Sequence, residues 1–291
     1  MLSRSDKDMV DAVNAWCTDS TAAEKRFGHI SEWNTSRVTS MEKLFKDRCN
    51  FNDYIGEWDV SSVTSMKSMF QGCEVFNGDL SKWNVSNVTS MEVMFDLCNQ
   101  FHSDLSQWNV SQVTSMEGMF YNCYKFDCDL SKWNVSNVTS MEYMFKGCNQ
   151  FHSNLSQWNV SNVTSMHSMF NLCTQFRSDI SKWNVSEVQD ISWMFEDCPQ
   201  FFSDLSKWDV SKVTLMNRTF KGCNKFDCDI SQWNVSNVTE MGKMFYKCKN
   251  FHGNLSQWND NKVTNMEQMF KQCPITNKHK PKKAQRSCSI M

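Results

Sequence analysis

Cysteine is the residue type in this chain that could do the most chemistry. The sequence contains 14 cysteines, but it lacks the Cys-x-x-Cys pairs typical of zinc sites. Many recur at one constant interval, as from Cys73 to Cys98, at the end of a hydrophobic stripe where a small apolar side chain fits. We therefore expect buried free thiols, with disulfides or metal binding as the alternative. The regularly spaced cysteines, called the cysteine row below, are Cys73, Cys98, Cys123, Cys148, Cys173, Cys198, Cys223, Cys248 and Cys273.

A loop that carries histidine or aspartate in three successive repeats is the second candidate for chemistry. His102, Asp127 and His152 occupy the same place in their repeats, and Cys128 follows Asp127. If neighbouring repeats stack about 5 Å apart, these side chains could share a zinc ion. Similar residues around His252 instead indicate a duplicated loop that faces solvent. We expect no metal and no cofactor, and keep His102, Asp127, Cys128 and His152 as the metal-binding alternative.

The chain lacks the residue arrangements of the common enzyme classes. Its nine glycines are too sparse for a phosphate-binding loop, and neither a Walker sequence nor a dinucleotide-binding fingerprint is present. Apart from the loop just described, the six histidines are scattered, so no nucleophile and base stand out as a pair. We therefore predict that the protein is not an enzyme.

The last four residues resemble a prenylation signal. Cys288 is followed by Ser, Ile and Met, and a terminal Met favours farnesyl. Five basic residues precede it with no acid among them, which supplies the second signal that one lipid chain needs for attachment to an anionic membrane surface. In a eukaryotic cytosol we expect a lipid on Cys288, and in a bacterium none. The basic residues are Lys278, Lys280, Lys282, Lys283 and Arg286.

The rest of the chain is acidic. Without the five basic tail residues, 25 of the 30 basic residues remain and oppose all 32 acidic ones. The net charge of this part is therefore about −7. Such a body argues against nucleic acid as a partner. No stretch approaches the roughly 18 apolar residues of a membrane span, and the first residues lack the apolar core of a signal peptide. We expect a cytoplasmic protein, at the inner face of a membrane if Cys288 is modified.

A repeat positions all of these residues. Ten tryptophans follow one another at a single interval, the one between Trp33 and Trp58, without insertion or deletion. A fixed period of about 20 to 50 residues is typical of coils that stack and bury a hydrophobic face that one copy could not cover. The repeats therefore predict one elongated domain. The ten residues are Trp33, Trp58, Trp83, Trp108, Trp133, Trp158, Trp183, Trp208, Trp233 and Trp258.

Each repeat contains the pattern of a short strand followed by that of a short helix. Trp133 and Val135 alternate with a polar residue, which predicts an inward-facing strand. A stripe then follows at the i, i+3, i+4, i+7 spacing of one helical face, over residues 141–148. Thr139 precedes Glu142 by three residues, which predicts a capping box at the start of that helix. We expect an α/β repeat solenoid of about ten coils, each with a short parallel strand and a short helix.

The repeat pattern Leu-x-x-Trp-x-Val-x-x-Val-Thr-x-Met-x-x-Met-Phe-x-x-Cys-x-x-Phe resembles the BspA-like leucine-rich repeats, in the 25-residue form noted in mycoplasma-type surface lipoproteins. The resemblance covers most of the chain. It implies a right-handed solenoid like that of leucine-rich repeats, and a surface or adhesion protein without assigned chemistry. The chain departs from the exported members because it shows no signal peptide or amino-terminal lipidation signal.

Three parts are expected along the chain. Residues 1–27 would form an amino-terminal cap, with one helix over residues 6–27 covering the first coil. Residues 28–275 would form the repeats. Residues 276–291 are polar, basic and without periodicity, so we expect a disordered tail that ends in the Cys288 signal.

The outward residue between Trp and Val of each repeat forms a polar row, called the asparagine row below. Its functional interpretation is an extended face that binds a protein partner of unknown identity. The structural alternative is that asparagine side chains pair with one another along the stack. The row consists of Asn84, Asn109, Asn134, Asn159, Asn184, Asp209 and Asn234.

Together these patterns predict a non-enzymatic protein-interaction scaffold, tethered to a membrane by prenylation of Cys288. The alternative is a cell-surface adhesion or recognition protein, as the BspA-like resemblance implies. A regular polar face would also suit ice or glycan binding, but we expect the threonine of each repeat to cap a helix instead.

Overall fold

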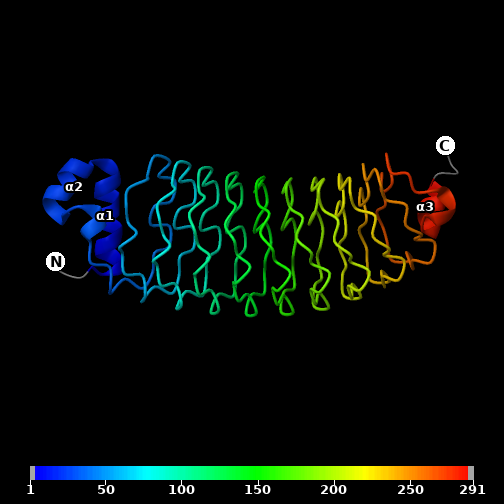
Figure 1. Cartoon of the computed structure of the whole chain (residues 1–291), viewed down its shortest axis with the longest axis horizontal. Coiled ribbons are helices and arrows are strands. Elements are labelled where there is room, and N and C mark those ends of the chain that lie inside the picture. Colours follow the sequence, from blue (N-terminus) through cyan, green and yellow to red (C-terminus); the bar gives the residue numbers. More distant parts are fainter. Residues whose placement is uncertain (1–3, 288–291) are drawn as a thin grey trace.

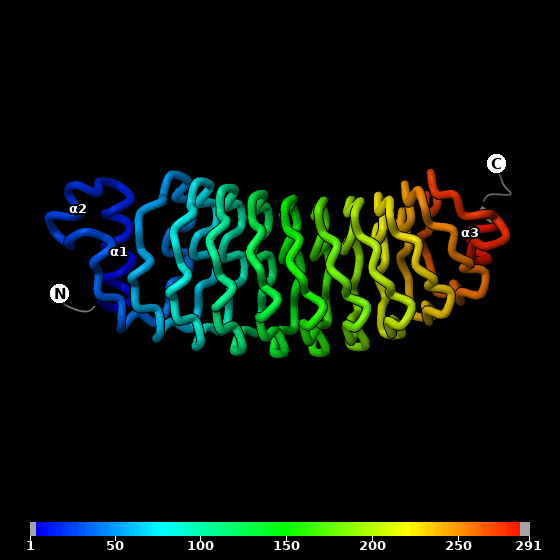
Figure 2. Tube along the Cα trace, viewed as in Figure 1, coloured from blue at the N-terminus to red at the C-terminus, as the bar shows by residue number. Residues whose placement is uncertain are grey.

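The computed structural model, which describes residues 4–287, is an elongated row of coils with helices at its two ends (Figure 1). Helices α1 (Asp6–Thr18) and α2 (Ser20–Phe27) and the 3-10 turn η1 (Ile30–Glu32) precede the coils. The 3-10 turn η2 (Asn277–His279) and helix α3 (Lys282–Ser287) follow them. The coils lie side by side in chain order, so the first and last described residues lie at opposite ends of the molecule (Figure 2).

Each coil is built from tight turns. Up to six times per coil a backbone N–H donates to the carbonyl three residues earlier, which is the hydrogen bond of a β-turn. The chain therefore changes direction repeatedly and closes one circuit in each repeat. In a representative coil these bonds measure 2.9 to 3.3 Å, and their donors are Trp133, Val138, Met144, Lys146, Cys148 and Phe151.

These turns correct the expected α/β repeat solenoid. Tyr143 (φ 56°) and Gly147 (φ 79°) adopt left-handed backbone inside the segment expected to be helical, and their equivalents in the other coils do the same. An α-helix needs consecutive right-handed residues, so none can form there. Within residues 4–287 helix accounts for only 11% and bridge residues for 4%, with no sheet. The predicted strand and helix of each coil, the leucine-rich-repeat geometry and the capping box of Thr139 and Glu142 are therefore wrong.

Backbone hydrogen bonds join each coil to the next. Adjacent coils share one isolated parallel bridge, such as Ser140 with Ser165. Beside this bridge, alternate N–H groups of one coil donate to carbonyls of the next, as Tyr143 does to His167 at 2.9 Å. All of these N–H groups point toward the carboxyl-terminal end of the row. In the representative coil the four donors are Met141, Tyr143, Phe145 and Gly147.

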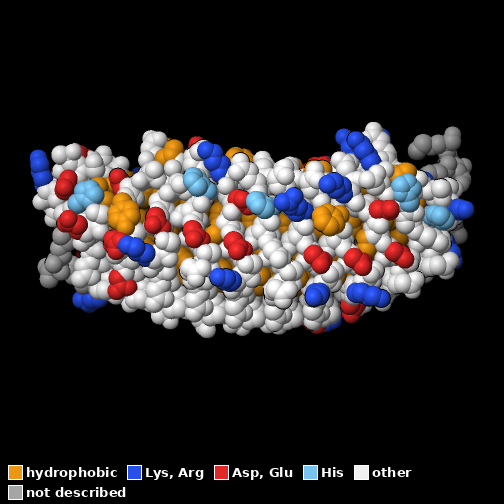
Figure 3. Space-filling view, viewed as in Figure 1, with side chains coloured by type: hydrophobic (Ala, Val, Ile, Leu, Met, Phe, Trp, Pro, Cys, Tyr) orange, Lys and Arg blue, Asp and Glu red, His pale blue; other side chains and the backbone are white. Residues whose placement is uncertain are grey.

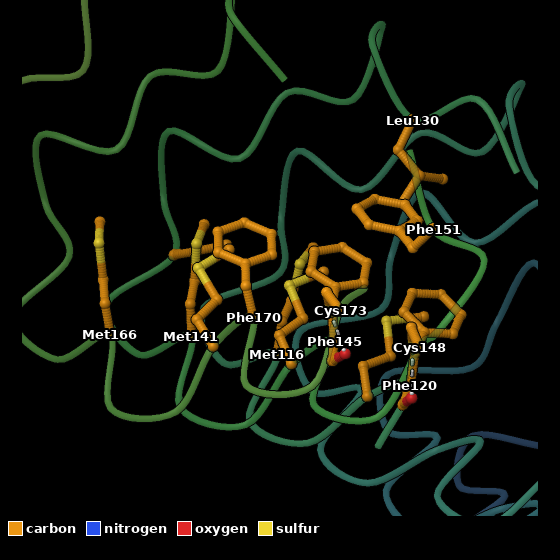
Figure 4. Packing of buried hydrophobic residues seen from close by; sticks show 14 of the residues in the cluster. Met116, Phe120, Leu130, Met141, Phe145, Cys148, Phe151, Met166, Phe170 and Cys173 are labelled. Atoms are coloured by element: carbon orange, nitrogen blue, oxygen red, sulfur yellow. Dashed lines mark hydrogen bonds between the residues drawn. The ribbon is translucent and has the colours of Figure 1, made fainter. Parts of the chain in front are cut away.

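Phenylalanine and methionine side chains fill the coils in columns that run along the molecule (Figure 4). Phe145 stacks on Phe151 of its own coil with ring centroids 4.1 Å apart. It also stacks on Phe120 and Phe170 of the neighbouring coils at 5.7 Å. Stacked rings of this kind add about 0.5 to 1.5 kcal/mol per pair beyond the burial of apolar area. The core is therefore continuous from coil to coil.

The tryptophan side chains point inward, as their register predicts. Trp133 is only 3% exposed, and its indole N–H donates to the carbonyl of Leu105 in the preceding coil at 3.0 Å. Each tryptophan from Trp58 to Trp258 makes the equivalent bond, at 2.8 to 3.2 Å. Each indole thus serves both as core and as a link between coils.

Helix α1 lies across the first coil and closes the amino-terminal end of the row (Figure 1). Asp6 accepts a backbone N–H from the first coil at 2.7 Å, and Asn14 accepts an arginine N–H from it at 2.8 Å. The single helix expected over residues 6–27 is divided at Asp19, which ends α1 and caps α2 with its side chain. The chain reverses there, so α1 and α2 pack against each other.

The segment after residue 276, expected to be a disordered tail, has regular structure as far as Ser287. Lys283 of α3 donates its backbone N–H to the carboxylate of Asp260 at 2.7 Å, and Ala284 is buried. Asp260 stands where the coils from Val60 to Val235 have an inward valine, and it is only 4% exposed. Helix α3 therefore covers the side of the last coil on which Asp260 lies.

Candidate functional site

The asparagine row is exposed, but its side chains bond their own backbone. In each member the side-chain Oδ1 accepts the backbone N–H of the serine two residues later, at 3.0 to 3.2 Å. This is the hydrogen bond of an Asx turn, which starts a corner of the coil. The row members therefore each serve a local turn rather than pairing with one another. Its members are Asn84, Asn109, Asn134, Asn159, Asn184, Asp209 and Asn234.

A second Asx turn lies in the loop before each tryptophan from Trp83 to Trp258. Asp129 accepts the backbone N–H of Ser131 at 2.9 Å, and this bond lowers the pKa of the Asp129 carboxyl. Asn154 and Asn254 make the same bond without a charge. Two Asx turns per coil explain why Asp or Asn followed by a hydrophobic residue and Ser recurs through the chain.

The threonine near the asparagine row bonds the coils together. Thr139 donates its backbone N–H at 2.9 Å and its hydroxyl at 3.2 Å to the carbonyl of Thr114, one coil earlier. The equivalent hydroxyl bonds recur along the row. This bond replaces the expected helix cap and explains the regular threonine without reference to a ligand.

The cysteine row is buried from Cys73 to Cys248 and half-buried at Cys273, and the 13 described cysteines are free thiols. Cys148 donates to the carbonyl of Phe120 at 2.9 Å, and the row repeats this bond from Cys73 to Cys248. Burial raises the pKa of Cys73 to about 12 and also raises the pKa of Cys123. A thiol held neutral in this way is a poor nucleophile and a poor metal ligand.

The four candidate metal ligands do not lie together, because His102, Asp127 and His152 are exposed and Cys128 is buried. Asp127 and His152 are exposed and pair at 2.7 Å, while His102 lies 3.1 Å from the amide of Asn77. Cys128 is buried and accepts a backbone N–H from the preceding coil at 3.1 Å. Among residues 4–287 no three potential ligands come together in a metal site.

One side of the row changes from coil to coil, and sequence reasoning missed it. Tyr121 and Tyr143 stack with centroids 6.1 Å apart, and Tyr143 meets His167 edge-on at 4.9 Å. The ammonium of Lys146 lies 5.1 Å from the Tyr121 ring. The signal that could have found this surface is variation at equivalent places of the repeat. We call it the variable face and define it by Tyr121, Tyr143, Lys146, His167, Trp193 and Arg218, all half-buried.

A hollow of about 370 Å³ opens beside Trp193 and Arg218, with Glu240 in its wall. The guanidinium of Arg218 lies 4.1 Å from the Trp193 ring and 3.4 Å from the carboxylate of Glu196. Glu196 is almost fully buried and also bonds Lys221. The buried carboxylate of Glu196 therefore holds Arg218 in place, and Arg218 in turn packs on the Trp193 ring. The half-buried indole is thus a rigid aromatic group at the surface.

The basic residues expected to bind a membrane are partly engaged with the last coil. The Lys283 ammonium donates to two carbonyls of that coil, each at 2.8 Å. The Lys280 ammonium lies 5.8 Å from the ring of Phe270. Lys278 and Lys282 are exposed. Of these basic residues, Lys280 and Lys283 thus contact the last coil, whereas Lys278 and Lys282 face solvent.

The prenylation candidate Cys288 and the side chain of Arg286 lie outside the described residues. Within the part of the chain that the structure describes, no helix is long and apolar enough to cross a membrane. Acidic and basic side chains are mixed along the face drawn in Figure 3.

Comparison with known proteins places the whole row of coils in one family. The model of the family described as "Mycoplasma protein of unknown function, DUF285" matches residues 14–130, 98–205 and 175–283. The three overlapping matches together run from the middle of α1 to α3. No curated protein matches the chain.

Proposed function

Because the chain belongs to the family of Mycoplasma proteins of unknown function, DUF285, its role has to be argued from its own surface, and we propose that it is a non-enzymatic protein-interaction scaffold. The partner is a protein, and the contact is made by the variable face rather than by the asparagine row. The molecule acts by presenting a long, regular surface and catalyses no reaction.

The observation that carries this proposal is the division between constant and changing side chains. The asparagine, threonine, cysteine and tryptophan of each coil all bond backbone groups, so the fold alone accounts for their recurrence. The variable face differs from coil to coil and is not explained in this way. Aromatic and arginine side chains in such a surface are the types enriched at binding hot spots.

The finer elements of the proposal rest on the sequence. The BspA-like resemblance of the repeat supports an adhesion or recognition role at a cell surface as the alternative setting for the same scaffold. The Cys288 signal and the basic residues before it support a lipid tether at the inner face of a membrane in a eukaryotic cell. These two settings place the partner on opposite sides of a membrane.

A matched pair of variants tests the proposed contact. Tyr143→Ala with Trp193→Ala alters the variable face, and Asn109→Ser with Asn134→Ser alters the asparagine row while keeping a side chain that can form the local turn. Affinity purification from the source cell should recover a protein with the wild type and the asparagine variant, and lose it with the aromatic variant. Recovery that follows the asparagine row instead would overturn the assignment. Thermal unfolding of each variant checks that the coils remain intact.

A separate experiment tests the tether. Wild type and Cys288→Ser, expressed in a eukaryotic cell, should differ in their share of the membrane fraction, and mass spectrometry should find a farnesyl group only on the wild type. An unmodified wild-type carboxyl terminus would rule out the tether and leave the scaffold proposal standing.

A further inference from the structure

The last coil presents a row of backbone N–H groups that have no acceptor. In every earlier coil the four equivalent groups donate to carbonyls of the next coil. Within residues 4–287 no hydrogen bond is formed by these four groups of the last coil, and Gln268 and Gln272 are exposed. Unpaired N–H groups retain a strong demand for an acceptor. They belong to Met266, Gln268, Phe270 and Gln272.

These N–H groups stand at the positive end of aligned peptide dipoles. The equivalent peptide units of successive coils point the same way, so their dipoles add along the row as they do in a helix. The opposite end, where the carbonyls of the first coil lie, is covered by α1. Among residues 4–287 the N–H groups at the carboxyl-terminal end are therefore left uncovered, and this end favours negative charge.

Part of the core is also uncovered at this end. Met266 and Phe270 are half-buried, whereas their equivalents Met241 and Phe245 in the preceding coil are fully buried. Helix α3 bonds the other side of the coil, through Asp260. An occupant would thus find apolar contact and hydrogen-bond donors on one surface.

The surroundings of this surface are basic. Residues 260–287 contain seven lysines and arginines and two acids, Asp260 and Glu267, and of these Lys283 and Asp260 bond each other on the other side of the coil. Lys271 is exposed on the last coil itself, and the Lys280 ammonium lies over the Phe270 ring. The lysines and the positive end of the aligned peptide dipoles therefore both attract a negatively charged ligand.

We propose that the carboxyl-terminal end face, defined by Met266, Gln268, Phe270, Lys271 and Gln272, binds an acidic peptide segment of a partner protein. This inference rests on the proposed scaffold function and names a second contact surface for it. The four N–H groups of the last coil have no carbonyl between them that faces the same way. A ligand therefore has to supply hydrogen-bond acceptors only. Carboxylates are acceptors only, whereas a neutral peptide in the regular β conformation would place N–H groups as well as carbonyls opposite the row.

The test uses the full chain and a fluorescent glutamate-rich peptide of about ten residues, long enough to span residues 266–272. A glutamine-rich peptide of the same length is the neutral probe. We expect saturable binding of the acidic peptide, weakened by salt, and at least about tenfold weaker binding of the neutral one. Lys271→Glu should reduce affinity about fivefold or more, while Lys125→Glu, an exposed reversal on a middle coil, should change it little.

Hydrogen exchange locates the contact. The amides of Met266, Gln268, Phe270 and Gln272 should exchange fast in the free protein and slow down when the acidic peptide binds. Equal affinity for both peptides, no binding, or binding without protection of these amides overturns the proposal. Protection of them by anionic vesicles but not by the peptide would assign the end face to a membrane instead. The Tyr143→Ala, Trp193→Ala variant should bind the peptide normally, so this proposal and the variable face can fail separately.

Discussion

Most recurring polar side chains of this protein serve its backbone. A coil made of turns leaves many N–H and C=O groups without the regular partners that a helix or sheet would supply, and buried backbone groups must be paired. The asparagine Oδ1, the threonine hydroxyl, the cysteine thiol and the indole N–H each complete one such bond per coil. At the scale of the residue, regularity is therefore evidence of structure before it is evidence of binding.

Cysteine reactivity tests this view of the core. Cys49 is exposed, whereas the cysteine row is buried from Cys73 to Cys248 and burial raises the pKa of Cys73 to about 12. Alkylation of the native protein at about pH 8 should therefore modify Cys49 first and leave Cys98 to Cys248 unmodified until the chain unfolds. Peptide mapping by mass spectrometry scores each cysteine separately. Rapid labelling of the row in native protein would show that the core opens or that the thiols are not buried.

Acid should destabilise the protein through the Asx turns. Hydrogen bonds from Ser131 lower the pKa of Asp129, and the equivalent serines lower the pKa of Asp179 and four other aspartates. A carboxyl with a folded pKa below its unfolded value of about 3.9 adds stability above that value and loses it as the pH falls through the folded pKa. Stability should thus fall below about pH 4.

Asparagine is the matched control for this effect, because Asn154 already forms the same turn. The double variant Asp129→Asn, Asp179→Asn should have wild-type stability at pH 7 and a shallower loss in acid. Urea unfolding at a series of pH values measures both. Identical acid profiles for variant and wild type would remove the aspartate turns as the cause.

At the scale of the element, the sequence predicted the inward-facing residues but not the backbone that holds them. The spacing of Met141, Met144, Phe145 and Cys148 is the same for a helical face and for a series of turns that each close on the third residue. Periodicity cannot separate the two. The signal that could have done so is glycine in the expected helix, as at Gly147, because glycine is disfavoured inside helices and favoured at positive φ.

Gly147 also makes room for a neighbour. A Cβ at this residue would lie 2.4 Å from Oδ1 of Asn122 in the preceding coil, and its φ of +79° is left-handed. Gly147→Ala should therefore destabilise the protein by about 1 to 3 kcal/mol, from backbone strain and the clash together. In an Asn122→Gly background only the strain remains, so the cost should be smaller. Denaturant unfolding of the four proteins gives the coupling, and additive effects would show that the two residues do not interact.

At the scale of the whole molecule, the sequence predicted the period and the stacking, because an uninterrupted register of tryptophans leaves little freedom. The end structure was harder to predict. Asp260 breaks the hydrophobic pattern of the repeat, yet it is buried and accepts an N–H from α3. Its hydrogen-bond partner, Lys283, belongs to α3, which is not part of the repeats. The repeat pattern therefore does not predict this contact.

Removal of one whole coil tests whether the molecule is a one-dimensional stack. Hydrogen bonds between coils join each coil to its direct neighbours, so stability should be close to a sum over coils. Deletion of residues 158–182 removes one complete repeat, keeps the register of every remaining coil and leaves Gly147 beside Asn122 and Gly222 beside Asp197. We expect a folded protein that is less stable by about 1 to 4 kcal/mol, from typical stability per residue. Deletion of residues 158–170 breaks the register and should unfold at least the coils that follow. Circular dichroism and urea unfolding distinguish the two, and equal damage from both deletions would contradict a stack of independent coils.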